Sequence, residues 1–419
     1  MASAREARTE SSARLAAPGR APAAVSISLA DRQLVKDSFG RLMASQQFAM
    51  EYLYARLFVQ HPQFRALFPF SMEHTRISTF EMLGKLVASL DSPDQADLLL
   101  SRLGRDHRKF GVKEHHLGPF FDALLATVEQ VCGRSWVQGL DVAWVNVLRY
   151  FSDAMKAAAD EDARNQPAWW IGEIVQHDRR TPTIAVLTIR PDRPLKYEPG
   201  QYLAVQVPKW PRLWRRYSIA NAPRENGLLD LHVRAVPGGM VSTTLVSHSG
   251  TGDIVTLAAA SGDLRVPADP ERDLVCVAGG TGLAPIKAIV ESVVGEMRQG
   301  KRREITMYVG ARRSADLYDM RDLATLRLAY PALTLVPVVE AELEIPGQVG
   351  RLPDVVRSHP SFRNTEVYLA GPASMISATR RTLSARVPSD RFHHDPLDVL
   401  VAASRPVAIL RSASDHPRG

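Results

Sequence analysis

The hydrophobic pattern of this chain changes its period once, and that change limits how the chain can fold. Between Ser28 and about Ala163, apolar residues recur at steps of three and four, as they do on one face of a helix. After ARNQPAWW, the segment WWIGEIVQHDRRTPTIAVLTIRP alternates apolar with polar residues and is rich in β-branched side chains, which is typical of strands. The sequence therefore predicts an all-helical domain followed by a β-rich one.

A capping signal marks where the helices begin. Ser28-Leu-Ala-Asp31 places a capping serine three residues before an acidic residue, directly ahead of apolar residues at helical spacing. We expect helices between Ser28 and Pro62 and over 77–90, 97–110, 117–132 and 140–159.

A third pattern follows the β-rich region. DLVCVAGGTGLAPIKAIVESVV, residues 273–294, has an apolar strand, a turn with Gly280, Thr281 and Gly282, and a helix with Pro285 in its first turn. ITMYVGA, TLVPVVE and TEVYLAG supply further strands. This is half of a βαβ nucleotide-binding unit, although it lacks the GxGxxG fingerprint and is a weak signal in isolation. It predicts an α/β domain with a parallel sheet.

The length of 419 residues suits about three domains. We expect a disordered tail over 1–27, an all-helical domain over 28–163, an antiparallel β-barrel over 164–267, a parallel-sheet α/β domain over 268–400 and a second tail over 401–419.

Composition narrows the functional classes. Hydrophobic residues make up 45% of the chain and charged residues 23%, and no apolar run is long enough to cross a membrane. The net charge of +7 comes from scattered arginines without a basic recognition helix, so we expect no nucleic-acid partner. Cys132 and Cys276 are too few for a disulfide framework, and the N-terminal region has no apolar signal segment. We therefore expect a cytoplasmic protein.

The stretch PGQYLAVQVPKWPRLWRRYSIANAP, residues 199–223, contains an Arg-x-Tyr-Ser cluster that closes a strand. A guanidinium suits a pyrophosphate, and an aromatic ring and a hydroxyl suit a flavin. The alternative is a half-buried basic strand without a ligand. The cluster resembles the FAD-binding barrel of ferredoxin reductase-like flavoproteins. The resemblance implies these FAD contacts: Gln201, Tyr202, Arg215, Tyr217 and Ser218.

Later segments extend the flavoprotein pattern. GGMVSTTL stands at an expected helix start, where backbone N–H groups can cradle phosphate; the alternative is a glycine turn capped by serine. LAGPASM matches the family's turn beside the nicotinamide, and RFHHDPLDVL keeps part of its flavin-side segment. The resemblance implies these further cofactor contacts: Gly239, Val241, Ser242, Gly371, Pro372 and Asp395.

Within the helical region, HPQFRALFPF around Phe68 and DLLLSRLGRDHRKF around His107 resemble the globin domain of the flavohaemoglobins. His107 shares a helical stripe with the apolar residues Leu99, Leu100, Leu103 and Phe110. The alternatives are a structural histidine and, for Tyr54, an ordinary core tyrosine. The resemblance implies that His107 ligates the iron of haem b, that Phe68 lies against the haem and that Tyr54 is the distal tyrosine.

Several positions depart from the family's pattern. The proximal carboxylate is expected to be Glu161, although Asp160 and Asp162 compete with it. The distal position often held by glutamine falls near Thr75. Three further residues replace a tyrosine, a cysteine and a phenylalanine of the family, respectively: Leu117, Ala370 and Leu397.

The resemblance covers roughly Ser28 to Leu400 and implies a divergent flavohaemoglobin. It implies that NAD(P)H reduces FAD, that electrons continue singly to haem, and that nitric oxide and dioxygen become nitrate. NADH is the expected donor; NADPH is possible because Arg312, Arg313 and Ser314 follow a strand where a 2′-phosphate could bind. We expect a monomer or weak dimer. Two alternatives stay open: a flavohaem oxidoreductase with another donor or acceptor, such as an organic acid, and a haem-based gas or redox sensor.

Overall fold

The computed structural model describes residues 27–266, 269, 271–297, 303–341 and 346–396. Apart from Ile27, both expected tails lie outside the described residues, and so does Leu397. The chain divides into two compact units, Met1–Ala168 and Trp169–Gly419. Within the described ranges, no helix has both the length and the apolar character needed to cross a membrane.

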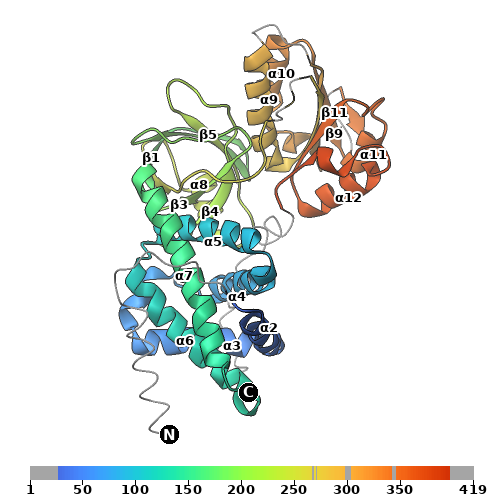
Figure 1. Cartoon of the computed structure of the whole chain (residues 1–419). Helices are drawn as coiled ribbons and strands as arrows, with labels where there is room; N and C mark the ends of the chain where they lie inside the picture. Colours follow the sequence, from blue (N-terminus) through green and yellow to red (C-terminus); the bar gives the residue numbers. More distant parts are fainter. Residues whose placement is uncertain (1–26, 267–268, 270, 298–302, 342–345, 397–419) are drawn as a thin grey trace, which may run out of the picture. The chain divides into compact units, whose positions relative to one another are not determined.

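The first unit is helical, as predicted (Figure 1). Its main helices are α2 (Leu29–Ala44), α3 (Gln46–Gln60), α4 (Glu73–Ala88), α5 (Pro93–His107), α6 (Glu114–Cys132) and α7 (Leu140–Asn165). The Ser28 hydroxyl accepts a hydrogen bond from the N–H of Asp31 at 3.0 Å, which confirms the predicted cap of α2. α7 runs past the expected end at 159, because nothing disfavours helix until Pro167 restricts the residue before it.

One apolar core holds these helices together. Trp144 of α7 is fully buried, and its indole N–H donates to the hydroxyl of Ser38 on α2 at 3.0 Å. α5 approaches α7 at Gly104, where a side chain would lie 2.2 Å from the carbonyl oxygen of Met155. This close approach fixes α5, and His107 is the last residue of that helix.

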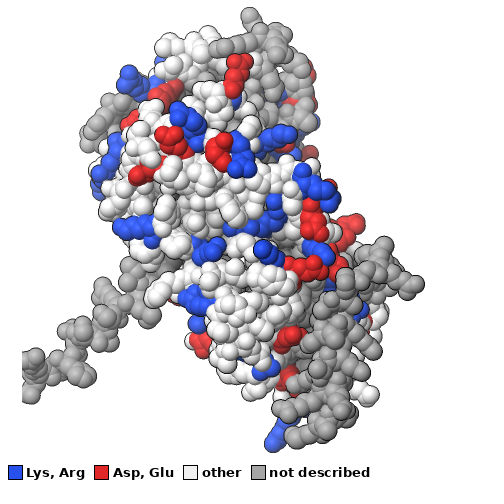
Figure 2. Space-filling view, turned by 90° about the vertical axis from the view of Figure 1, so that its left-hand side faces the viewer, with Lys and Arg blue, Asp and Glu red and all other residues white. Residues whose placement is uncertain are grey.

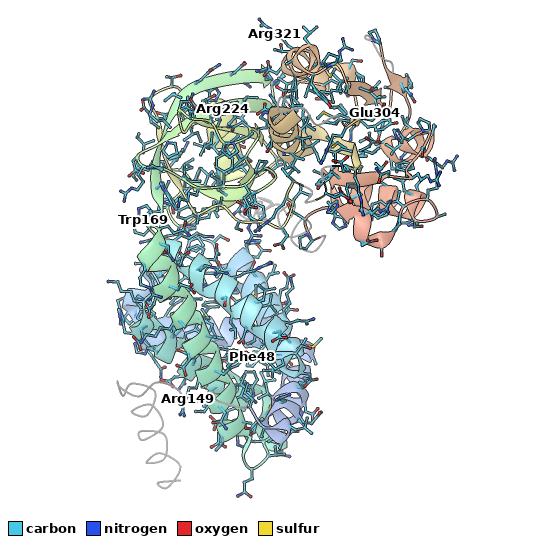
Figure 3. The ribbon with its side chains drawn as sticks, turned by 45° about the horizontal axis from the view of Figure 1, so that its top comes forward. Phe48, Arg149, Trp169, Arg224, Glu304 and Arg321 are labelled. Atoms are coloured by element: carbon cyan, nitrogen blue, oxygen red, sulfur yellow. The ribbon has the colours of Figure 1, made fainter. Side chains whose placement is uncertain are left out.

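The second unit begins at Trp169, labelled in Figure 3, and its first part is an antiparallel sheet. The strands are β1 (Trp170–Thr181), β2 (Ile184–Pro191), β3 (Tyr202–Gln206), β4 (Arg215–Ser218), β5 (Leu229–Arg234) and β6 (Ile254–Leu257), in the order β4-β3-β6-β1-β2-β5. A bridge between Ile219 and Leu231 joins the two edges, so the sheet curls into the predicted barrel. The helix α8 (Met240–Ser247) buries Val241 and Leu245 in the barrel's core.

The second part is a parallel sheet, also as predicted. Its strands are β7 (Asp273–Gly279), β8 (Ile305–Ala311), β9 (Leu333–Val339), β10 (Gln348–Val349), β11 (Thr365–Ala370) and β12 (Phe392–His393), in the order β10-β9-β8-β7-β11-β12. In Figure 1, α9 (Leu283–Met297) and α10 (Met320–Ala329) cover one face, and α11 (Leu352–Arg357) and α12 (Ala373–Leu383) cover the other. Alternation along β7 supports both layers, since Cys276 belongs to the core beneath α9 and Val277 to the core beneath α12.

The barrel and the parallel sheet are joined by a partly buried ionic cluster. On the face that Figure 2 presents, charges of both signs are interspersed. Lys287 of α9 lies 2.8 Å from Asp319, and Arg180 of β1 lies 2.9 Å from Asp322. Ile184 of the barrel also packs in the apolar core of the parallel-sheet part. The two parts therefore share one interior.

We predict that Lys287→Met lowers the free energy of unfolding of the second unit by about 3 kcal/mol, because it leaves the buried Asp319 with only the longer contact, 3.5 Å, to Arg180. Asp319 is 1% exposed, and burial raises its pKa although Lys287 opposes the rise. Urea unfolding followed by circular dichroism measures the change. Lys196→Met, at an exposed lysine of the same unit, is the control, and equal stability of the two variants would contradict the prediction.

Candidate functional site

The predicted metal ligand, His107, sits at the C-terminal end of α5 and is turned into the helical unit. Its Nδ1 lies 2.8 Å from the carbonyl oxygen of Leu103, and its ring meets the edge of Phe110 at 6.0 Å between centroids. Burial lowers the pKa of His107, although the charge of Asp106 opposes the shift, so the ring is neutral near pH 7. A neutral imidazole whose Nδ1–H donates to a carbonyl keeps the lone pair of Nε2 for a metal.

The expected carboxylate partner, Glu161, is not brought to this histidine. Glu161 is exposed, and no contact joins it to His107 among the described residues. Asp162 instead forms a buried ion pair with Arg108, whose guanidinium also donates to the carbonyl of Gln166 at 2.9 Å. The helix explains this placement: the inward face of α7 passes through Ala158 and then Asp162, one turn later, and Glu161 projects to the side.

The predicted distal tyrosine, Tyr54, lies on α3 and is 2% exposed. Its ring meets Phe68 edge-on at 5.5 Å between centroids, so the structure brings these two predicted residues together. Its hydroxyl lies 2.7 Å from the hydroxyl of Thr79 on α4. Burial raises the pKa of Tyr54 to about 12, and the phenol therefore keeps its proton at neutral pH.

Thr79, the hydrogen-bond partner of Tyr54, was not predicted from the sequence. The expectation placed the distal helix position near Thr75, and Thr79 follows it by one helical turn on the same side of α4. That spacing was the available signal. It could not show which of the two threonines reaches Tyr54.

The strand β4 presents the predicted Arg215 and Tyr217 on one side of the barrel sheet. They oppose Val205 and Leu203 of β3 in the antiparallel register. Arg215 is half-buried and donates to the carbonyl of Trp214 at 2.8 Å, and no carboxylate lies within ion-pair distance of it in the described part of the chain. Burial lowers the pKa of this guanidinium. A partly desolvated cation without an acidic partner suits an anionic pyrophosphate.

The other side of β4 assembles three more predicted residues. Ser218 pairs with Tyr202 across the sheet. A side-chain carbon built at Gly262 would lie 3.2 Å from the Tyr202 ring and 3.7 Å from Oδ1 of Asp395, so residues far apart in the sequence meet here. That Asp395 oxygen is buried, and it has no hydrogen-bond partner among the residues that the structure describes. Burial and the charge of Asp263 raise the pKa of Asp395 to about 6, although a backbone hydrogen bond from Asp263 opposes the rise. A buried acceptor of this kind suits an N–H or hydroxyl of a bound flavin.

Two predicted positions serve the fold of their loops. The Gln201 side chain accepts the N–H of Glu198 at 2.9 Å and so holds the turn before β3. At the start of α8, the Ser242 hydroxyl donates a hydrogen bond to the carbonyl of Gly239 at 3.2 Å, and Val241 is buried in the core. At this helix start the backbone N–H groups, rather than these side chains, are the groups left for a phosphate.

The predicted nucleotide residues converge at the carboxyl ends of the neighbouring strands β7 and β11. The strand order reverses between these two strands, which is where open parallel sheets bind nucleotides. A side-chain carbon at Gly282 would lie 2.3 Å from the carbonyl oxygen of Ala370, so the turn at 280–282 packs directly on the turn formed by Gly371 and Pro372. The half-buried Thr281 lies between the two glycines of the first turn.

Three family models match the chain in the order of these sites. A globin model matches residues 51–155, an oxidoreductase FAD-binding domain model 173–265 and an oxidoreductase NAD-binding domain model 276–381. The chain is a flavohaemoglobin-like fusion. It is an oxidoreductase, and its cofactors are haem, FAD and NAD(P)H.

Solved structures and curated proteins resemble different parts of this fusion. The flavohemoglobin of Malassezia yamatoensis with bound FAD and heme matches its fold with a TM-score of 0.73 and 16% identity, over 88% of this chain and 98% of that one. The electron transfer component XylA of xylene/toluene monooxygenase from Pseudomonas putida is 33% identical over 53% of this chain and 65% of its own length. The reductase subunit of an aromatic O-demethylase from Amycolatopsis is 35% identical over 48% and 60%, respectively. The chain thus spans less than two thirds of the length of these two relatives.

We predict that Arg215→Ala weakens FAD binding to the flavohaemoglobin-like fusion by about ten- to a hundredfold, because a hydrogen bond to a charged group contributes about 1.5 to 3 kcal/mol. Titration of the apoprotein with FAD, followed by flavin fluorescence, measures the affinity. Arg190→Ala is the control, since Arg190 pairs with Glu173 on the barrel surface and is 60% exposed. Unchanged FAD affinity in Arg215→Ala would remove this residue from the site.

Proposed function

We propose that the protein is an NAD(P)H-dependent nitric oxide dioxygenase that converts nitric oxide and dioxygen to nitrate. Electron transfer from NAD(P)H through FAD to haem is the reaction class of the fusion. The observation that carries the finer proposal is Tyr54, a buried phenol that keeps its proton and lies beside Phe68. Such a phenol is a donor for a gaseous ligand with negative charge on its outer atom.

The electron count of the proposed reaction fits a donor of electron pairs followed by an acceptor of single electrons. One hydride supplies two electrons, and each conversion of nitric oxide and dioxygen to nitrate takes one. Two nitric oxide and two dioxygen molecules with one NAD(P)H therefore give two nitrates, one NAD(P)⁺ and one proton. When bound, FAD accepts the electron pair and haem takes single electrons.

The protein's own residues hold and orient these partners in the proposal. His107 offers Nε2 to the iron, and Leu103 fixes the ring by accepting from Nδ1. Arg215 offers its guanidinium to the FAD pyrophosphate, and the paired turns at 280–282 and 371–372 offer backbone to the nucleotide. NADH is the proposed donor; Arg312, which is exposed after β8, leaves NADPH as the other candidate.

A second candidate function is electron transfer to another acceptor, without efficient nitric oxide dioxygenation. The proposed proximal histidine, His107, favours it, because its hydrogen-bond partner is the backbone carbonyl of Leu103 and Glu161 is exposed. A carboxylate partner would raise the basicity of the ligand more than a carbonyl does. The relatives that are reductase components of oxygenase systems support the same candidate.

Nitric oxide consumption by haem- and FAD-replete protein tests the proposal. With NADH and dioxygen present, we expect nitric oxide to disappear at an electrode and two nitrates to form per NADH oxidised. His107→Ala, which removes the proposed ligand, should abolish consumption. If NADH reduces the flavin and the haem but nitric oxide is not consumed, electron transfer to another acceptor replaces dioxygenation as the function.

We predict that Tyr54→Phe speeds dioxygen dissociation about tenfold. A bond from the phenol to a charged acceptor contributes about 1.5 to 3 kcal/mol, and the bond to Thr79 that it replaces contributes about 0.5 to 1.5 kcal/mol. The difference corresponds to about a tenfold change. Stopped-flow dioxygen release measures it, with Tyr52→Phe on the same helix as the control. Reduction of FAD by NADH should be unchanged, and an unaltered release rate in Tyr54→Phe would remove Tyr54 as the distal donor.

A further inference from the structure

Tyr54 and Thr79 share one hydrogen bond, and this bond competes with any bond from Tyr54 to a bound gas. Their hydroxyl oxygens are 2.7 Å apart, so one hydrogen bond joins them and either group can be its donor. Each hydroxyl carries one proton. When Tyr54 donates to Thr79, the phenol has no proton left for a ligand. A gas can receive that proton only if the bond between the two residues breaks or reverses.

Acidity sets the direction of the bond in the absence of a ligand. A phenol, with an ordinary pKa of about 10, is a much better donor than an aliphatic alcohol, and the alcohol oxygen is the better acceptor. Tyr54 is held for this bond by its ring contacts with Phe58 at 5.9 Å and Phe68 at 5.5 Å between centroids. Thr79 comes from a different helix, so the bond also ties α3 to α4.

We infer that Thr79 competes with bound gas for the Tyr54 proton and so sets which gases the pocket retains through a hydrogen bond. This inference rests on the proposed role of Tyr54 as the distal donor. A gas with negative charge on its outer atom accepts a charge-assisted bond, which is roughly twice as strong as a neutral one, and wins the proton. A weakly polar gas, such as carbon monoxide, loses to Thr79. Thr79 is therefore a specificity-determining residue: a gas is retained through Tyr54 only if it accepts the phenol's proton more strongly than the Thr79 hydroxyl does.

The valine variant removes the competitor and keeps the β-branched shape. In Thr79→Val, the buried phenol has lost its partner, and an unsatisfied buried donor is costly, so any gas that accepts its proton is held more tightly. We expect dioxygen dissociation to slow about two- to tenfold. We also expect the C–O stretching frequency of the carbon monoxide complex to fall, because the phenol is now free to donate to it. Thr79→Ser, which keeps a hydroxyl, should behave as the unmodified protein does in both measurements.

The experiment uses haem- and FAD-replete full-length protein in four forms: unmodified, Thr79→Val, Tyr54→Phe and the double variant. The slower release and the lower C–O frequency in Thr79→Val should both disappear in the Tyr54→Phe background. Faster or unchanged release in Thr79→Val, or an effect that persists without the Tyr54 hydroxyl, would overturn the inference. None of these measurements uses nitric oxide or NADH, so a failure of the proposed dioxygenation would be seen separately.

Discussion

The direct contact between the turn at 280–282 and the turn after β11 is the constraint on which the second unit depends. Gly282 lies so close to the Ala370 carbonyl that any side chain there would collide with backbone. The two turns end neighbouring parallel strands, so the contact also fixes the register of β7 and β11 at the point where the strand order reverses. A nucleotide site made of backbone in this way depends on main-chain positions more than on side-chain identity, which agrees with the alanine that stands where the family has a cysteine.

In the helical unit, the main constraint is the burial of neutral polar groups in an apolar interior. Burial keeps both His107 and Tyr54 uncharged near pH 7, by lowering one pKa and raising the other. Each group is then oriented by one hydrogen bond, to Leu103 and to Thr79 respectively. The imidazole is left as a base and the phenol as an acid.

The sequence predicted the fold because hydrophobic period is a local property. Steps of three and four, alternation and apolar strands before glycine turns each identified the correct class of domain in the correct order. Alternation also explains why Arg215 and Tyr217 share one face of the barrel. What the sequence could not give is rotation about a helix axis. Glu161 and Asp162 are adjacent in the sequence but point in different directions, and Thr75 and Thr79 share a face of α4 while Thr79 is the one that hydrogen-bonds Tyr54 among the described residues. Such differences depend on tertiary packing. The assignments of individual cofactor contacts remain predictions.

The position of Asp395 has a consequence for how such proteins can be rearranged. Its buried oxygen lies beside Tyr202 of the barrel, although the parallel-sheet part separates the two residues in the sequence. Ile184 of the barrel also belongs to the core of the parallel sheet. Gene recombination that replaced only one of these two parts would therefore break the shared core and separate Asp395 from Tyr202. The two parts of the second unit therefore form one structural module, whereas the helical unit is a separate compact unit.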